Sequence, residues 1–214
     1  AKFTTNGVDS SVDLLALAGD LNLAGVEGVD YAPSQVRLAA LLGDVTTAIY
    51  QLPGENGQLD VLAGGGITLL GVKQYDIAQV RLPGITNPML GGSSVSNPLT
   101  DNAAVNKHTS TFWHLNDDEA SRLIAKSGDI SGPADQSDLI LEFNEAVHVE
   151  AAGSFSNLGL ISQHISDDDV TRIEVGGSII MPTAPRATVG KTVIQVNGPG
   201  SLEVIAGTDL SLIH

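Results

Sequence analysis

The chain has 214 residues, of which 42% are hydrophobic, only 4% are aromatic and 16% are charged, with 24 glycines and no cysteine. A chain of this length can bury a sizeable core, which here must consist of small aliphatic side chains. The formal net charge of −15 argues against nucleic acid as a partner, the lack of cysteine excludes disulfides and thiolate metal sites, and no apolar run is long enough to span a membrane.

A short unit recurs along the chain, a glycine, then a small or acidic residue, then an apolar residue. Its copies are Gly19-Asp20-Leu21, Gly43-Asp44-Val45, Gly65-Gly66-Ile67, Gly128-Asp129-Ile130, Gly153-Ser154-Phe155, Gly177-Ser178-Ile179 and the longer Gly207-Thr208-Asp209-Leu210. Most copies are 22 to 25 residues apart. A fixed period of this size is typical of repeat architectures.

An alternating apolar pattern precedes each copy and predicts short strands with one buried face. In chain order, the strands are expected near residues 12–18, 36–41, 59–63, 122–126, 147–151, 171–175 and 202–206. At the corner after each strand, glycine can supply a positive φ, and the next Asp or Ser can bond nearby backbone amides. The predicted structural corners are Gly19, Asp20, Gly43, Asp44, Gly128, Asp129, Gly207 and Asp209.

The period alone also fits leucine-rich repeats, but the segments between the predicted strands are rich in Gly, Pro, Ser and Asn and lack a helical pattern. We therefore predict an all-β fold, a β-solenoid whose rungs stack their apolar anchors on one another. About nine rungs would give a rod of roughly 40 Å at the usual spacing between strands.

The repeat is interrupted at residues 72–118, between expected rungs in 1–71 and 119–214. We expect one or two irregular rungs here, together with an extruded loop. Long loops in repeat proteins often carry function, so the candidate partner-binding residues are Tyr75, Phe112, Trp113 and His114. In the alternative interpretation, Trp113 fills a gap in the core.

Two acidic clusters are weak candidates for metal binding. His114 lies near Asp117, Asp118 and Glu119, but the pattern matches neither an EF-hand loop nor a pair of histidines four residues apart. Residues 167–169 are three consecutive aspartates, whose side chains alternate in direction on an extended chain. We therefore predict turn-forming roles for these residues, with no metal site, no cofactor and no catalytic residue.

Five segments resemble a known family when they are taken in order. They read SQVRLAALLGDVTT, GQLDVLAGGGITLLG, HLNDDEASRLIAKSGDI, LEFNEAVHVEAAGSFSNLGLISQHISDDDVTRIEVGGSI and NGPGSLEVIAGTDLSL. The series, over about residues 10–214, resembles the filamentous-haemagglutinin-like region of the large exoproteins that bacteria export by two-partner secretion. The resemblance implies a right-handed parallel β-helix, an outer-membrane transporter as export partner, and a secreted or surface location on a Gram-negative bacterium. It supplies no catalytic motif.

Three functions follow as hypotheses. The first is an adhesive or structural stalk, with a host or bacterial surface receptor or glycan as partner. The second is a filament subunit that associates end to end through uncapped strand edges. The third is a carbohydrate-active β-helix enzyme that uses Asp101, Asp117, Asp118 and Glu119. It is disfavoured because the chain has only ten lysines and arginines and few aromatic residues.

The first residue is not Met and no signal-peptide pattern opens the sequence, so we expect a fragment of a longer protein.

Overall fold

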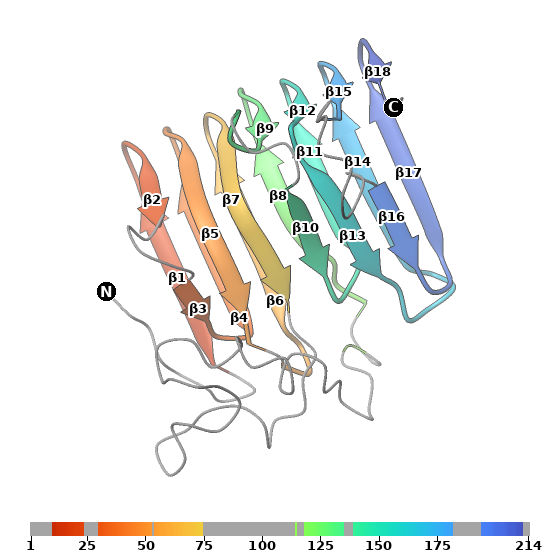
Figure 1. Cartoon of the computed structure of the whole chain (residues 1–214). Helices are drawn as coiled ribbons and strands as arrows, with labels where there is room; N and C mark the ends of the chain where they lie inside the picture. Colours follow the sequence, from red (N-terminus) through yellow and green to blue (C-terminus); the bar gives the residue numbers. More distant parts are fainter. Residues whose placement is uncertain are drawn as a thin grey trace.

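In the part of the chain that the structure describes, all regular secondary structure is β-strand. The computed structural model describes residues 10–23, 30–52, 54–74, 114, 118–134, 139–181 and 194–211. It contains 18 strands and no helix in these ranges (Figure 1), so this part of the chain offers no helical membrane span. The prediction of an all-β fold is confirmed for this part.

The first sheet has seven parallel strands. In spatial order, they are β1 (Ser11–Ala16), β4 (Gln35–Ala40), β6 (Gln58–Ala63), β8 (Ser121–Ala125), β11 (Val147–Ala151), β14 (Val170–Val175) and β17 (Ser201–Ala206). Each lies within two residues of a strand predicted from the alternating pattern, which confirms that prediction.

The second sheet is also parallel and faces the first. Its strands are β2 (Leu21–Leu23), β3 (Asp30–Ala32), β5 (Val45–Gln51), β7 (Ile67–Gln74), β9 (Ile130–Ser131), β10 (Ile140–Phe143), β12 (Phe155–Ser156), β13 (Gly159–Gln163), β15 (Ile179–Ile180), β16 (Ile194–Asn197) and β18 (Leu210–Ser211). Along the chain, each first-sheet strand is followed by one or two second-sheet strands. We call each such unit a repeat and number the repeats 1 to 7.

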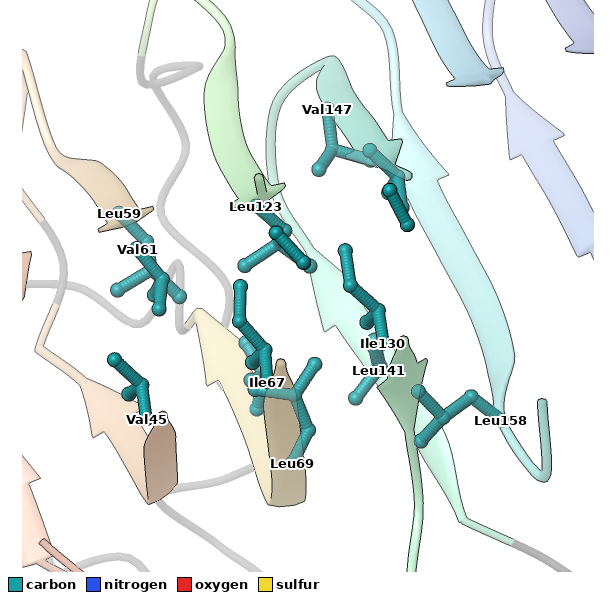
Figure 2. Packing of buried hydrophobic residues seen from close by; sticks show 14 of the residues in the cluster. Val45, Leu59, Val61, Ile67, Leu69, Leu123, Ile130, Leu141, Val147 and Leu158 are labelled. Atoms are coloured by element: carbon teal, nitrogen blue, oxygen red, sulfur yellow. The ribbon is translucent and has the colours of Figure 1, made fainter. Parts of the chain in front are cut away.

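Equivalent side chains of successive repeats form columns, because neighbouring strands pair in parallel at equivalent positions. The central column of the first sheet is Leu14, Leu38, Val61, Leu123, Val149, Ile173 and Val204. The apolar anchors after the corners form a second column, Leu21, Val45, Ile67, Ile130, Phe155, Ile179 and Leu210, as predicted. Side chains from both sheets, including Val61 and Ile67, fill the space between them (Figure 2).

The interruption differs from the expectation. Because β6 pairs directly with β8, and β7 with β9, no irregular rung lies between repeats 3 and 4 in either sheet. In addition, β7 continues to Gln74, so the regular structure extends past the expected boundary at residue 72. The described residues therefore give seven repeats instead of about nine, which corresponds to a stack of roughly 30 Å.

Candidate functional site

The corner residues link each repeat to the next. Asp20 Oδ1 accepts the Asp44 amide at 2.9 Å, Asp44 Oδ1 accepts the Gly66 amide at 2.7 Å, and Asp129 Oδ1 accepts the Ser154 amide at 2.6 Å. The series continues in later repeats, where Ser154 Oγ accepts the Ser178 amide at 3.1 Å. These side chains thus bond the corner of the following repeat, whereas the sequence suggested bonds within their own turn. We call this series the corner ladder.

The corner glycines are required for a different reason from the expected one. Of the four predicted corner glycines, only Gly19 has a positive φ, at +104°. At Gly43, an added Cβ would lie 2.2 Å from the Gly19 carbonyl oxygen, and at Gly207 it would lie 2.2 Å from the Gly176 carbonyl oxygen. Glycine is therefore needed at these two corners because the backbone of the preceding repeat occupies the space of a side chain.

Polar side chains are buried where the second sheet leads back to the first. Gln51, Gln74, Ser121 and Glu145 are 2%, 8%, 0% and 3% exposed, and they come from repeats 2 to 4. Ser121 begins β8 at a position where β1, β4 and β6 carry Val12, Val36 and Leu59. Together with His114, these residues form what we call the buried polar cluster.

The Gln74 amide is the hub of this cluster. Its Nε2 lies 3.0 Å from Gln51 Oε1, 2.9 Å from Ser121 Oγ and 2.9 Å from Glu145 Oε1, and the Ser121 hydroxyl also bonds Glu145 Oε1. In turn, Gln51 Nε2 donates to the Ser34 and Gln58 carbonyls at 2.7 and 2.9 Å. Buried polar groups need such partners to offset their loss of hydration.

His114 belongs to this cluster and does not present a binding surface. Its side chain lies in the core at 7% residue exposure, with Nδ1 3.7 Å from Glu145 Oε2. Its backbone has φ +63° and donates to the Glu55 carbonyl at 3.2 Å. His114, a predicted partner-binding residue, therefore packs inside the described part of the stack. The other predicted partner-binding residues, Tyr75, Phe112 and Trp113, lie outside the described residues.

A second buried network joins repeats 5 and 6. His164 Nε2 lies 2.8 Å from Thr171 Oγ1, which lies 2.8 Å from Ser162 Oγ, and His164 Nδ1 lies 2.9 Å from the Pro199 carbonyl. A carbonyl can only accept, so Nδ1 carries a proton and donates to Pro199. Sequence reasoning missed both networks. The available signal was a Ser or Thr in an otherwise aliphatic column.

The outward face of the first sheet carries a column of charges. It contains Asp13, Arg37, Asp60, Arg122, His148, Arg172 and Glu203, and we call it the charge ladder. Arg122 forms two bonds to Asp60 at 2.8 and 2.9 Å, and these hydrogen bonds raise the pKa of its guanidinium despite partial desolvation. A shallow groove of about 180 Å³ lies beside the first repeats, lined by Ser11, Val12, Asp13, Gln35, Val36, Arg37, Gln58 and Asp60.

The acidic clusters seen in the sequence have backbone and side-chain partners. Glu119 Oε2 accepts from Gln58 Nε2 at 3.1 Å, and Asp118 is exposed. Asp169 Oδ2 accepts the amides of Ile165 and Ser166 at 2.7 and 2.9 Å, which closes the turn before β14. Asp101 and Asp117 lie outside the described residues. Within the part of the chain that the structure describes, no three His, Cys, Asp or Glu residues gather to hold a metal ion.

Comparison with known proteins gives no relative for this chain. No protein-family model matches it, and neither a curated protein nor a solved structure shows significant similarity.

Proposed function

We propose that this chain is an extracellular stalk segment with a structural or adhesive role, part of a secreted bacterial exoprotein, and that its stacked repeats form a right-handed parallel β-helix. The observation that supports the proposal most is that the side chains repeated along the sequence hold the stack together. Leu38 and Val61 pack in an apolar column, and Asp20 and Asp44 bond the next repeat. The recurring residues thus serve the stack itself.

A stack of this kind suits a spacer. Each repeat contacts mainly the repeats before and after it, so length can be added without a change in the core. Parallel strands in two facing sheets give every repeat two rows of backbone hydrogen bonds to its neighbour. Adhesive proteins need this property, because a binding region must be held at a distance from the cell.

The sequence resemblance supports the remaining parts of the proposal. The filamentous-haemagglutinin-like segments suggest export through an outer-membrane transporter and a place at or beyond the surface of a Gram-negative cell. A host or bacterial receptor or glycan would be the partner. We propose no catalytic role, since Glu119 bonds Gln58 and Asp169 closes a turn.

Deletion of residues 84–110, which lie outside the described residues, tests the adhesive part of the proposal. The strands on either side of the interruption pair directly, so the far-UV circular dichroism spectrum should remain that of a β protein while attachment to a surface weakens. A Gly/Ser segment of equal length in place of 84–110 is the matched control for chain length. If both variants attach as well as the original chain, the interruption has no adhesive role.

A direct assay for polysaccharide cleavage tests the enzyme alternative. We expect no cleavage. The stalk proposal would be wrong, and the enzyme alternative would take its place, if the original chain depolymerised a polysaccharide and Asp118→Asn abolished this activity without changing the secondary structure.

A second candidate function is a subunit of an extracellular filament. It is favoured by the edges of the first sheet, where β1 and β17 each pair on one side only among the described strands. An unpaired edge of a parallel sheet is a template for another strand.

A further inference from the structure

One buried carboxylate holds the residues on both sides of the interruption. Gln74 is the last described residue before it, and His114 is the first described residue after it. Gln74 Nε2 lies 2.9 Å from Glu145 Oε1, and His114 Nδ1 lies 3.7 Å from Glu145 Oε2. The side chains of His114 and Glu145 are 4% and 3% exposed. The two oxygens of one side chain therefore face two residues that are 40 positions apart in the sequence.

The hydrogen bonds at Glu145 favour its ionised form. Oε1 accepts from the Gln74 amide and from the Ser121 hydroxyl. The Ser121 oxygen itself accepts the Leu59 amide at 2.9 Å, so its single proton is directed to Glu145. Hydrogen bonds donated to a carboxylate stabilise its negative charge. Because that charge is buried, it needs a positive charge close by.

The other charged groups on the elements around Glu145 lie at exposed positions or on the outward faces of the sheets. They are Glu55, Asp60, Lys73, Asp118, Glu119, Arg122, Glu142, His148 and Glu150. Lys73 pairs with Glu142, and Arg122 pairs with Asp60. Among the described residues, the group that faces Glu145 and can carry a positive charge is the His114 ring.

The backbone of His114 fixes the position of this ring. Its φ of +63° is a left-handed conformation, which residues with a side chain seldom adopt. Its amide donates to the Glu55 carbonyl at 3.2 Å. A conformation of this kind persists where the surrounding contacts hold it. The placement of the ring against Glu145 is therefore a specific feature of the joint between repeats 3 and 4.

We propose that protonated His114 and ionised Glu145 form a buried charge pair that makes this joint sensitive to pH. The pair stabilises the joint in mildly acidic solution. When the pH rises and His114 loses its proton, the negative charge of Glu145 is no longer balanced by the ring, and the joint weakens. This device belongs to the fold and operates whether or not the chain serves as a stalk.

The direction of the effect follows from proton linkage. In the folded chain, the ring beside Glu145 holds its proton more tightly than in the unfolded chain. Its contribution to stability is therefore complete below the ordinary range of histidine, about pH 6.5, and is lost as the pH rises beyond that range. The carboxylate sets the lower limit, because protonation of Glu145 in stronger acid also removes the pair.

Urea unfolding at pH 6 and pH 8, followed by circular dichroism, compares the original chain with His114→Gln. Between these pH values, the ratio of unfolded to folded protein should rise by roughly tenfold more in the original chain than in the variant. His148→Gln is the matched control, because His148 is exposed on the outward face of the first sheet, and it should behave like the original chain. The proposal is wrong if His114→Gln and the original chain change equally, or if His148→Gln removes the difference as well.

Glu145→Gln tests the other half of the pair. It keeps the size of the side chain and an oxygen for Ser121 and Gln74, but it removes the charge. The variant should lose the same part of the pH dependence as His114→Gln. A folded Glu145→Gln variant with the full pH dependence of the original chain would overturn the pairing.

Nuclear magnetic resonance of the original chain, labelled with ¹⁵N-histidine, gives a measurement that needs no variant to fold. The chain has five histidines, and protonated and neutral rings differ in their ¹⁵N chemical shifts. After assignment of the ring signals, we expect His114 to be protonated at pH 7.5, where an ordinary histidine is mostly neutral. A neutral His114 ring at pH 7.5 would overturn the proposal.

Discussion

At the scale of single residues, the fold contains buried positions that do not tolerate substitution and, a few residues away, exposed positions that do. Leu38 is fully buried between Leu14 and Val61 in the central column. Asp44, six residues later, is exposed and contributes one side-chain acceptor to the next repeat. A change at the first position disturbs three repeats, whereas a change at the second alters one hydrogen bond.

Leu38→Asp should therefore destabilise strongly and Asp44→Ser mildly. An unpaired carboxylate in the column costs several kcal/mol, so we expect a loss of at least about 3 kcal/mol in the free energy of unfolding. Serine already serves as the corner acceptor at residue 154, so Asp44→Ser should cost under about 1 kcal/mol. Urea unfolding followed by circular dichroism measures both. Equal losses would show that the inward and outward faces are assigned wrongly.

At the scale of elements, the charge ladder links strands through pairs of unequal strength. The Asp60 side chain is 14% exposed and lies between Arg122, at 2.8 Å, and Arg37, at 3.8 Å. Asp13 has one partner at 3.5 Å and a side chain that is 62% exposed. Burial strengthens an ion pair because less water screens it.

Asp60→Asn should accordingly cost more stability than Asp13→Asn. We expect about 1–2 kcal/mol for Asp60, whose bonds to Arg122 are charge-assisted and bidentate, and at most about 0.5 kcal/mol for Asp13. Thermal melting at neutral pH and low salt compares them. Identical melting temperatures would mean that the less exposed pair contributes nothing.

The pKa of Arg122 determines the pH range over which the Arg122–Asp60 pair stabilises the folded protein. Because the folded state raises that pKa, mainly through the hydrogen bonds to Asp60, the contribution of Arg122 is complete at every pH below the ordinary arginine value. It is lost only as the pH rises through the folded pKa. The stability difference between the original chain and Arg122→Gln should therefore stay constant between pH 7 and pH 10 in denaturant titrations, and a steady decline over this range would contradict this assignment.

At the scale of the whole molecule, the stack behaves as a series of similar units with one specialised joint. The buried polar cluster lies where repeats 3 and 4 meet across the interruption, and Gln74 of β7 bonds both Ser121 of β8 and Glu145 of repeat 4. A polar network of this kind fixes which groups must meet, since any other register would leave them buried without partners.

Removal of repeats 6 and 7 should leave a folded protein. A chain ending at residue 168 keeps five repeats and the buried polar cluster. We expect a circular dichroism spectrum of the same shape and a smaller denaturant m-value, because less surface is exposed on unfolding. A chain truncated instead to remove β8 onward loses Ser121 and Glu145 and should be much less stable than its length predicts. Complete unfolding of the 168-residue chain would show that the repeats do not act as separate units.

The amino-acid sequence by itself determined the repeat, the seven strands of the first sheet and the column of apolar anchors. These features depend on the period and on the alternating apolar pattern, which recur in every repeat and can be recognised in a short stretch of sequence. Only the tertiary structure decided the rest. The backbone that lies one repeat away explains the corner glycines, the hydrogen bonds of the corner ladder and the position of His114. The buried hydrogen bonds also join residues that are far apart in sequence: Gln51 bonds Ser34, 17 residues away, and Gln74 bonds Glu145, 71 residues away. The pairing of β6 with β8 likewise could not be predicted, because the length of an inserted segment does not say whether it adds a strand to the stack or leaves the neighbouring repeats in contact.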